Sequence, residues 1–343
     1  MKLYEITLKP QSGFGTPLKG DTLFGHFCWQ AAYDRDLLNG GLEKWIACYG
    51  ERPFAVFSSA WPKFQEKGKT RYAVKRPDLP LSFFFPEIEG NCSEAMKERK
   101  KRAGEKWMLI NEDLSLRLEQ GACRSDDDLL KMAGGQLTEE TDRMMRKQAA
   151  ARFQADLSQP HNTINRLTQT TGKGAFAPFS ETSWFYYPEM ELALFALLDE
   201  EATDIDRVTV ALTAIGLFGF GRDASTGGGR FSLGEWVEKT IPAADGANAC
   251  YIIAPAIPEK SDSSDNYFAP FVRFGKHGDR LARSANPFRN PVIMADEGAV
   301  FIPKTHAVFE KPYLGRPAFN TSKVMAQTVV QGYAPYLPFR LER

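Results

Sequence analysis

The sequence lacks the features that mark disulfide-rich, zinc-binding and membrane-spanning proteins. Its five cysteines, at positions 28, 48, 92, 123 and 250, include no Cys-x-x-Cys pair, and its four histidines are equally dispersed. We therefore expect neither a disulfide framework nor a zinc ribbon, and we predict no metal and no cofactor. No apolar run approaches the roughly 18–20 residues that span a bilayer, and the first residues lack the pattern of a signal peptide. These absences predict a cytoplasmic protein that does not bind membranes.

Net charge is also absent, because 43 basic and 43 acidic residues cancel. That balance excludes a uniformly basic coat but not a basic groove, since binding depends on where charges cluster. The two signs are in fact separated along the chain. Residues 184–270 carry 14 acidic and 5 basic side chains, whereas residues 271–343 carry 5 acidic and 11 basic ones. This separation suits a subunit that presents one face to nucleic acid and another to protein partners.

A basic stretch at 61–76 holds six Lys and Arg residues, interleaved with Trp61, Phe64 and Tyr72. Cations neutralise phosphates and aromatic rings stack on unpaired bases, so the mixture fits an RNA surface. A solvated charged face would give the same composition. From this stretch we select as candidate RNA contacts Arg71, Lys75 and Arg76.

The first half of the chain has the pattern of a mixed strand and helix unit. Residues 2–9 alternate as a strand does, and Asp21 is the predicted N-cap of a helix that runs to about Leu38. Gly25 inside that helix costs about 1 kcal/mol relative to alanine, a cost that close packing against the sheet or against a ligand would explain. Further strands are predicted at 53–58 and 79–85. The charge-dense residues 87–150 are predicted to be inserted helices and loops, partly disordered.

The second half opens with strand-like stretches at 184–187 and 192–198. A helix follows, with Thr203 and Asp206 as a predicted capping box and Gly219 closing it. Five strands are then expected, at 230–237, 250–254, 267–274, 291–294 and 299–302. Two such units with mostly antiparallel strands predict an α+β fold, because the evenly alternating βα repeats of a Rossmann fold are missing.

The glycine-rich segment 219–230, GFGRDASTGGGR, is the most informative stretch. It follows a helix and precedes a strand, so it matches neither a P-loop nor a dinucleotide fingerprint. A flexible turn is the simplest interpretation. The functional one is a backbone free of Cβ atoms, where RNA phosphate approaches main-chain N–H groups beside Arg222 and Arg230. Asp223 would repel phosphate, so we expect it to point away or to cap a neighbouring N–H.

A second polar segment, HNTINRLTQTTGKG at 161–174, is rich in hydrogen-bond donors and contains no obvious nucleophile or metal set. It reads either as a plain surface loop or as a loop that contacts phosphates and sugars. Its candidate RNA contacts are His161, Asn162, Asn165, Arg166 and Thr168.

These motifs together resemble the RAMP superfamily of CRISPR-associated proteins. The resemblance rests on LKGDTLFGHF at the first helix, HNTINRLTQTTGKG in mid-chain and the helix that leads into GFGRDASTGGGRF. The order and spacing are most similar to the Cas-five-like fourth subunit of type III-A (Csm) effectors. The type III-B and III-D sister subunits remain alternatives, and the insertion at 87–150 departs from the family pattern.

The resemblance implies two ferredoxin-like, RRM-related units, at 1–180 with the insertion at 87–150 and at 181–343 with the glycine loop. It implies a non-catalytic subunit of an antiviral effector complex that holds the 5′ handle of the CRISPR RNA. It also implies docking against the large polymerase- and nuclease-bearing subunit and a neighbouring backbone RAMP subunit. The RNA-facing positions that it implies are Lys19, Thr22, Arg166, Arg222, Arg230 and the loop glycines Gly219, Gly221, Gly227, Gly228 and Gly229. Our further candidate RNA contacts are His26, Ser225 and Thr226.

Three alternatives stay open at this point. A Cas-six-like endoribonuclease would use His26 as a general base, although such enzymes carry the glycine loop near the C-terminus. A metal-dependent, target-cleaving RAMP would use Asp21, which the pattern around it favours as a helix cap. A protein scaffold without RNA contact would use the acidic 184–270 segment.

Overall fold

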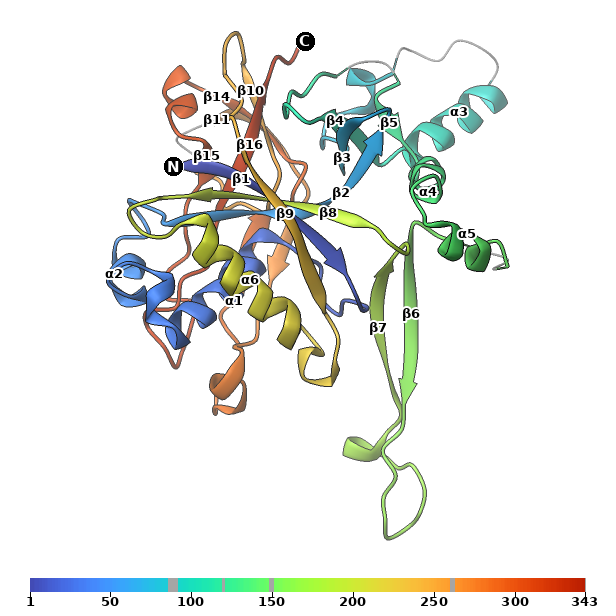
Figure 1. Cartoon of the computed structure of the whole chain (residues 1–343), viewed down its shortest axis with the longest axis vertical. Coiled ribbons are helices and arrows are strands. Elements are labelled where there is room, and N and C mark those ends of the chain that lie inside the picture. The colour runs from blue at the N-terminus through green and yellow to red at the C-terminus, as the bar shows by residue number, and fades with distance from the viewer. Residues whose placement is uncertain (86–91, 119–120, 148–150, 260–262, 343) are drawn as a thin grey trace.

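The core of the chain is a seven-stranded antiparallel sheet. The computed structural model describes residues 1–85, 92–118, 121–147, 151–259 and 263–342. The strand order of the sheet is β5-β4-β3-β2-β8-β1-β9 (Figure 1). Strands from both sides of residue 180 therefore pair within one sheet. They are β1 (Lys2–Pro10), β2 (Ala55–Glu66), β3 (Lys69–Lys75), β4 (Trp107–Asn111), β5 (Cys123–Arg124), β8 (Glu191–Leu198) and β9 (Phe231–Lys239).

Two helices, α1 (Gly20–Tyr33) and α6 (Ile205–Phe218), lie together on one face of this sheet (Figure 1). α1 connects β1 to β2, and α6 connects β8 to β9. In the sheet β8 lies between β1 and β2, and β1 lies between β8 and β9, so the two strand–helix–strand units interleave. The apolar stripe of α1, which includes Leu23, Phe24 and Phe27, is fully buried, as its spacing predicts.

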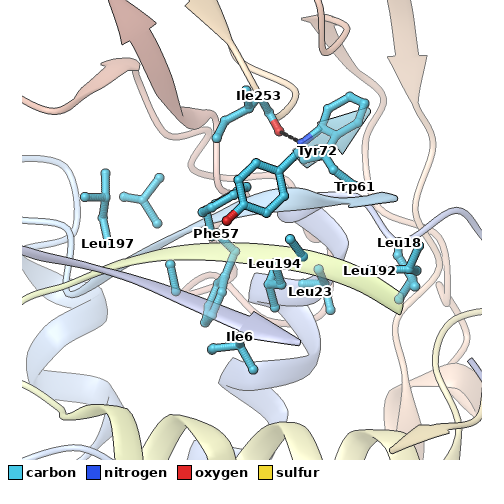
Figure 2. Close-up of a cluster of buried hydrophobic side chains, with 14 of the residues drawn as sticks. Ile6, Leu18, Leu23, Phe57, Trp61, Tyr72, Leu192, Leu194, Leu197 and Ile253 are labelled. Carbon is cyan, nitrogen blue, oxygen red and sulfur yellow. Dashed lines mark hydrogen bonds between the residues drawn. The ribbon is translucent and has the colours of Figure 1, made fainter. Parts of the chain in front are cut away.

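A second sheet, ordered β11-β14-β10-β16-β15, packs on the side of the first sheet away from α6 (Figure 1). Figure 2 shows one of the bonds between the two sheets, from Trp61 Nε1 to the carbonyl of Ile253 at 3.1 Å. The side-chain amide of Gln331 bonds the backbone of Phe57 in both directions, at 2.8 and 3.0 Å. The strands of this sheet are β10 (Ala249–Ile252), β11 (Ser263–Tyr267), β14 (Val300–Pro303), β15 (Tyr313–Gly315) and β16 (Tyr333–Phe339).

The remaining helices and strands lie outside the two sheets and the α1–α6 layer, or extend the edge of the main sheet. The charged insertion forms helices, as predicted, but it also adds β4 and β5 to the edge of the main sheet. No helix in the described ranges has the length and apolarity needed to cross a membrane. The remaining α-helices are α2 (Leu42–Ala47), α3 (Cys92–Gly104), α4 (Asp126–Gly134) and α5 (Glu139–Met145). One antiparallel ribbon pairs β6 (Gln154–His161) with β7 (Phe179–Tyr186), and a second pairs β12 (Pro270–Arg273) with β13 (Val292–Ala295).

The predicted start of α1 is wrong. The helix begins at Gly20, where an added Cβ would lie 2.1 Å from the carbonyl oxygen of Phe57, so close packing against β2 demands glycine there. Asp21 is buried and forms an ion pair with Arg273, with Oδ2 and Nε 2.6 Å apart, instead of capping the helix. The helix ends at Tyr33 rather than near residue 38, because a separate 3-10 turn follows at Arg35–Leu37.

The start of α6 also differs from the prediction. The Thr203 hydroxyl is buried and donates to the carbonyl of Leu37 at 2.8 Å, and Asp204 caps the helix by accepting the N–H of Arg207 at 2.9 Å. Gly219 ends the helix with φ of +106°, as predicted. Residues 79–85 do not form the expected strand; a 3-10 turn at Leu81–Phe83 takes its place.

The aromatic residues of the 61–76 stretch are in the core rather than on an RNA surface. Trp61, Phe64 and Tyr72 are each at most 4% exposed, because β2 and β3 are covered by protein on the faces where these rings lie. The prediction that they stack on bases is therefore wrong. The Tyr72 hydroxyl donates to the buried carboxylate of Glu5 at 2.6 Å, and Lys63 and Lys239 pair with the same carboxylate at 2.9 and 3.1 Å.

Candidate nucleic-acid interface

The glycine-rich loop packs tightly against the turn that follows β1. Its Gly229 N–H donates to the carbonyl of Gly13 at 2.8 Å, and its Arg230 N–H donates to the hydroxyl of Ser12 at 2.8 Å. Gly229 has φ of +70°, and a Cβ there would lie 2.1 Å from the Phe220 carbonyl oxygen. The conformation and the close approach both require glycine at this position.

Most amides of the loop are already bonded inside the protein. The N–H groups of 220, 221, 222 and 226–230 all donate to protein acceptors. Among the described residues, the loop amides without a partner are those of Asp223, Ala224 and Ser225, at the start of a single 3-10 turn. The predicted main-chain cradle for phosphate is thus much smaller than the glycine count indicates, since most of the glycines serve packing.

His26 on α1 anchors the loop. Its Nε2 accepts the N–H of Gly221 at 3.0 Å, and its ring lies 4.7 Å from the ring of the buried Phe220. Burial, together with the positive charge of Arg289, lowers the pKa of His26 to about 4. The imidazole is therefore neutral at physiological pH, with the Nε2 lone pair engaged by the loop and the ring proton on Nδ1.

The two arginines of the loop have different environments. The Arg222 N–H donates to the Thr16 hydroxyl at 2.9 Å, and its half-exposed guanidinium bonds the Asp223 carboxylate at 3.0 Å and the Thr182 carbonyl of β7. Asp223 thus points to its neighbour, which fits the expectation that it avoids a phosphate. Arg230 is exposed and forms no ion pair with any carboxylate in the described part of the chain. Arg230 can meet a phosphate without giving up an existing ion pair.

Two other predicted contacts on α1 flank this region. Lys19, just before the helix, is 15% exposed and pairs with Asp296 and, at 3.1 Å, with Glu297. Its charge is therefore already compensated inside the protein. Thr22 is partly buried one turn before His26.

The 161–174 segment forms the far end of a long ribbon, which projects from the body of the molecule (Figure 1). The sequence does not predict β6, and β7 begins five residues before the strand-like stretch expected at 184–187. At the tip, Asn165 Oδ1 accepts the N–H of Leu167 at 2.9 Å, which shapes the turn, and Leu167 is 94% exposed. His161 stacks on Phe179 with ring centroids 5.2 Å apart. Asn162, Arg166 and Thr168 are exposed on the same tip.

The structure does not bring the basic residues of β3 to the glycine loop. β3 is four strands away from β9, which is about 19 Å at the usual strand spacing. Their charges are also engaged: Arg71 pairs with Glu66 at 3.0 Å, Lys75 pairs with Asp78 at 3.0 Å, and the Arg76 guanidinium donates to two backbone carbonyls at 2.6 and 2.8 Å.

Sequence reasoning missed the residues that hold the loop in place. These are Ser12 and Thr16 in the turn after β1 and Thr182 on β7. Sequence reasoning also missed Arg289, whose positive charge acts on His26. The turn carries a signal, because SGFGTP is as rich in glycine as the loop it packs against. Thr182 and Arg289 carry none, since they meet α1 and the loop only through the tertiary fold.

The chain matches no family model and no curated protein. Its fold resembles that of the Csm4 chain in a crystal structure of a Csm1–Csm4 cassette in complex with pppApA, with a TM-score of 0.53, 16% identity, and coverage of 100% of this chain and 98% of that one. A Csm3–Csm4 subcomplex of the type III-A CRISPR–Cas interference complex gives a TM-score of 0.53, 14% identity, and coverage of 99% and 100%. A Csm1–Csm4 cassette in complex with cA4 gives a TM-score of 0.54 and 14% identity, with coverage of 100% of this chain and 98% of that one. The chain therefore has the fold of Csm4 over its whole length, as the resemblance of its motifs implies.

Proposed function

We propose that the chain is a non-catalytic RNA-binding subunit of a type III CRISPR effector, and that it holds the 5′ handle of the CRISPR RNA. The full-length likeness to Csm4 supports a place in such an effector. The observation that carries RNA binding is the surface we call the loop–α1 surface, which consists of the glycine loop 219–230, the α1 residues Thr22 and His26, and Thr182 midway along the ribbon.

This surface combines rigidity with accessible positive charge. His26 and Thr16 bind the loop backbone, so the loop enters binding already ordered and loses little conformational entropy. Arg230 is exposed, and the Arg222 side chain in the same loop is half exposed. The ribbon tip offers donors that can contact phosphates and sugars farther along the same strand. A single-stranded RNA that follows loop and ribbon would meet both predicted polar segments.

Partner subunits are part of the proposal. The structures that this chain resembles contain Csm1 with Csm4, and Csm3 with Csm4. We infer that this chain likewise docks against a large subunit and a backbone RAMP subunit. The separation of acidic and basic halves in the sequence suits such a subunit, which needs distinct RNA and protein faces.

The geometry favours binding over cleavage. A general base needs a free lone pair within reach of the attacked 2′-OH, and the Nε2 lone pair of His26 already accepts the Gly221 N–H. A metal-dependent nuclease needs free carboxylates, and Asp21 is buried in its ion pair with Arg273. We therefore propose that both residues are structural.

The interleaved units β1-α1-β2 and β8-α6-β9 have the strand order of a split βαβ, ferredoxin-like arrangement. We propose that they form one ferredoxin-like unit built from both halves of the chain, in place of a boundary at residue 180. The strands of the second sheet and the β12–β13 ribbon all come after β9 in the chain, and the β6–β7 ribbon interrupts the segment between β2 and β8.

The test is the double variant Arg222→Ala plus Arg230→Ala, measured for binding to labelled repeat-derived RNA over a range of salt. The loss of two phosphate contacts should weaken binding and make the log–log salt slope shallower by about 1.4, which is twice 0.7 for a single strand. Lys69→Ala plus Arg340→Ala, both outside the loop–α1 surface, are the matched control and should leave the slope unchanged. A folded loop variant with unaltered affinity and slope would refute the role of the loop.

A further inference from the structure

The guanidinium of Arg289, which is partly buried, lies near α1, because its charge acts on Asp21, His26 and Cys28 of that helix. Arg289 forms no ion pair and no side-chain hydrogen bond with any of the residues that the structure describes. Its backbone N–H donates to the Gly275 carbonyl at 2.8 Å, and a Cβ added at Gly275 would lie 2.5 Å from its guanidinium. Arg289 is therefore folded back over Gly275. Burial lowers the pKa of Arg289, and the carboxylate that acts on it, Asp21, is already paired with Arg273. The guanidinium therefore keeps hydrogen-bonding capacity that suits an anion binding from outside.

The segment that carries Arg289 is fixed to α1 at two places. Arg273 pairs with Asp21 near the start of the helix, and Gly278 lies against Trp29, with its would-be Cβ 3.4 Å from the indole nitrogen. Asp21 and Trp29 are eight residues apart, or about 12 Å along the helix axis. The Arg289 guanidinium acts on Asp21 and Cys28, and Gly25 lies between these two residues on the same face of the helix, four residues after one and three before the other.

That part of α1 contains Gly25, whose surroundings are empty. A Cβ at Gly25 would meet no atom within 4 Å, whereas one at Gly20 on the same helix would clash with β2. Packing inside the protein therefore gives no reason for glycine at 25, although glycine weakens a helix interior relative to alanine. The first explanation for Gly25, close packing against the sheet, is wrong, and close approach of a ligand to the helix backbone is what remains.

His26 joins this space to the glycine loop. It follows Gly25 directly, its Nε2 accepts the Gly221 N–H, and the positive charge of Arg289 contributes to the low pKa of its imidazole. His26 therefore interacts both with Arg289 and with Gly221 of the glycine loop. The ion pair between Arg273 and Asp21 is internally neutral, so Arg289 supplies the unbalanced positive charge at this end.

We propose that Gly25 and Arg289 form a phosphate subsite, where one phosphodiester of a single-stranded RNA lies over the α1 backbone and is bound by the Arg289 guanidinium. The inference rests on the proposed function and extends the loop–α1 surface across α1 to the 273–289 segment. The planar guanidinium bonds two phosphate oxygens at once, and the missing side chain at Gly25 lets the sugar–phosphate backbone approach the helix.

The decisive variants are Gly25→Ala and Gly25→Leu, because stability and binding should change in opposite directions. The added side chains enter open space and improve helix propensity, so the urea midpoint should rise or stay the same. Affinity for labelled repeat-derived RNA should fall by about tenfold for alanine and further for leucine. Gly104→Ala is the matched control, since Gly104 is also helical with no atom near its would-be Cβ, and it should leave affinity unchanged.

Arg289→Gln tests the charge. It should weaken RNA binding by about tenfold, the size of one charge-assisted bond, and make the salt slope shallower by about 0.7. RNA with a single neutral methylphosphonate linkage, placed at each position in turn, identifies the phosphate. At one position, the neutral linkage should weaken RNA binding by the wild-type protein as much as the Arg289→Gln substitution does. The same linkage should not weaken RNA binding by Arg289→Gln any further.

The outcomes separate the subsite from the wider function. If the wild-type chain binds the RNA and Gly25→Leu and Arg289→Gln bind it equally well, the subsite is wrong and the loop–α1 surface stands without it. If every methylphosphonate position affects wild type and Arg289→Gln alike, the guanidinium does not bind a phosphate. If the wild-type chain does not retain the RNA at all, both the subsite and the proposed function are wrong.

Discussion

The stability of the chain should fall on mild acidification because of His26. Its imidazole must stay neutral to accept the Gly221 N–H, and burial lowers its pKa from 6.5 to about 4. A group whose pKa is lowered in the folded state supports folding fully above its unfolded pKa, and loses that support as the pH falls from 6.5 toward 4. At pH 5.0 the unfolded chain binds the proton and the folded one does not. Linkage then makes His26 cost about 2 kcal/mol relative to pH 7.5.

Urea unfolding at pH 7.5 and pH 5.0 measures this difference. The comparison is between wild type and His26→Gln, which keeps an acceptor oxygen and cannot titrate. The wild-type free energy of unfolding should fall by about 2 kcal/mol more than that of the variant between the two pH values. Amide exchange at Gly221 should also be faster in His26→Phe, which preserves the ring but removes the acceptor. Equal losses of stability in wild type and His26→Gln would refute the assignment of a neutral, loop-binding imidazole.

Two further predictions concern stability, both read by urea unfolding. Glu5→Ala should cost about 3–5 kcal/mol, because it leaves two largely buried lysines without their carboxylate, whereas Tyr72→Phe should cost only about 1 kcal/mol. A loss under 1 kcal/mol for Glu5→Ala would show that the network is not needed. Gly229→Ala should prevent the loop from closing, since its Cβ would meet a carbonyl at 2.1 Å, while Gly227→Ala, at φ of +96° in open space, should cost about 1 kcal/mol. Equal costs for the two glycines would contradict the packing described for the loop.

Local patterns predicted much of the fold. The alternation at 2–9, the stripe of α1, the periodic helix ending at Gly219 and the apolar run of β8 all appear where the sequence indicates. The antiparallel α+β class is also correct. These features depend on short-range spacing and capping, which a sequence displays directly.

The errors come from long-range contacts. A basic stretch with aromatics reads as a surface, but the position of β2 and β3 inside a two-sheet stack turns its rings inward. Asp21 has the local signature of a cap, yet Arg273, 252 residues away, takes its carboxylate. The apolar and polar residues of 154–161 give no clear strand pattern, because both faces of the projecting ribbon are largely exposed.

The same distinction holds for the candidate site. The glycine loop and His26 come together as the predicted RNA-facing set requires, since both lie at ends or faces of strongly patterned helices. Lys19 and the arginine and lysine residues of β3 do not join them, because buried or neighbouring carboxylates and backbone carbonyls engage their charges. Arg289, which lies beside His26, was not predicted. Its role depends on a segment that only the tertiary fold places over α1.

If the loop–α1 surface holds a guide RNA by its 5′ end, the RNA that comes with the chain from its host should show it on sequencing. We expect small RNAs that share one repeat-derived 5′ end, and their loss from the Arg222→Ala plus Arg230→Ala variant. Recovered RNA with scattered 5′ ends, or an equal yield from wild type and variant, would contradict this expectation.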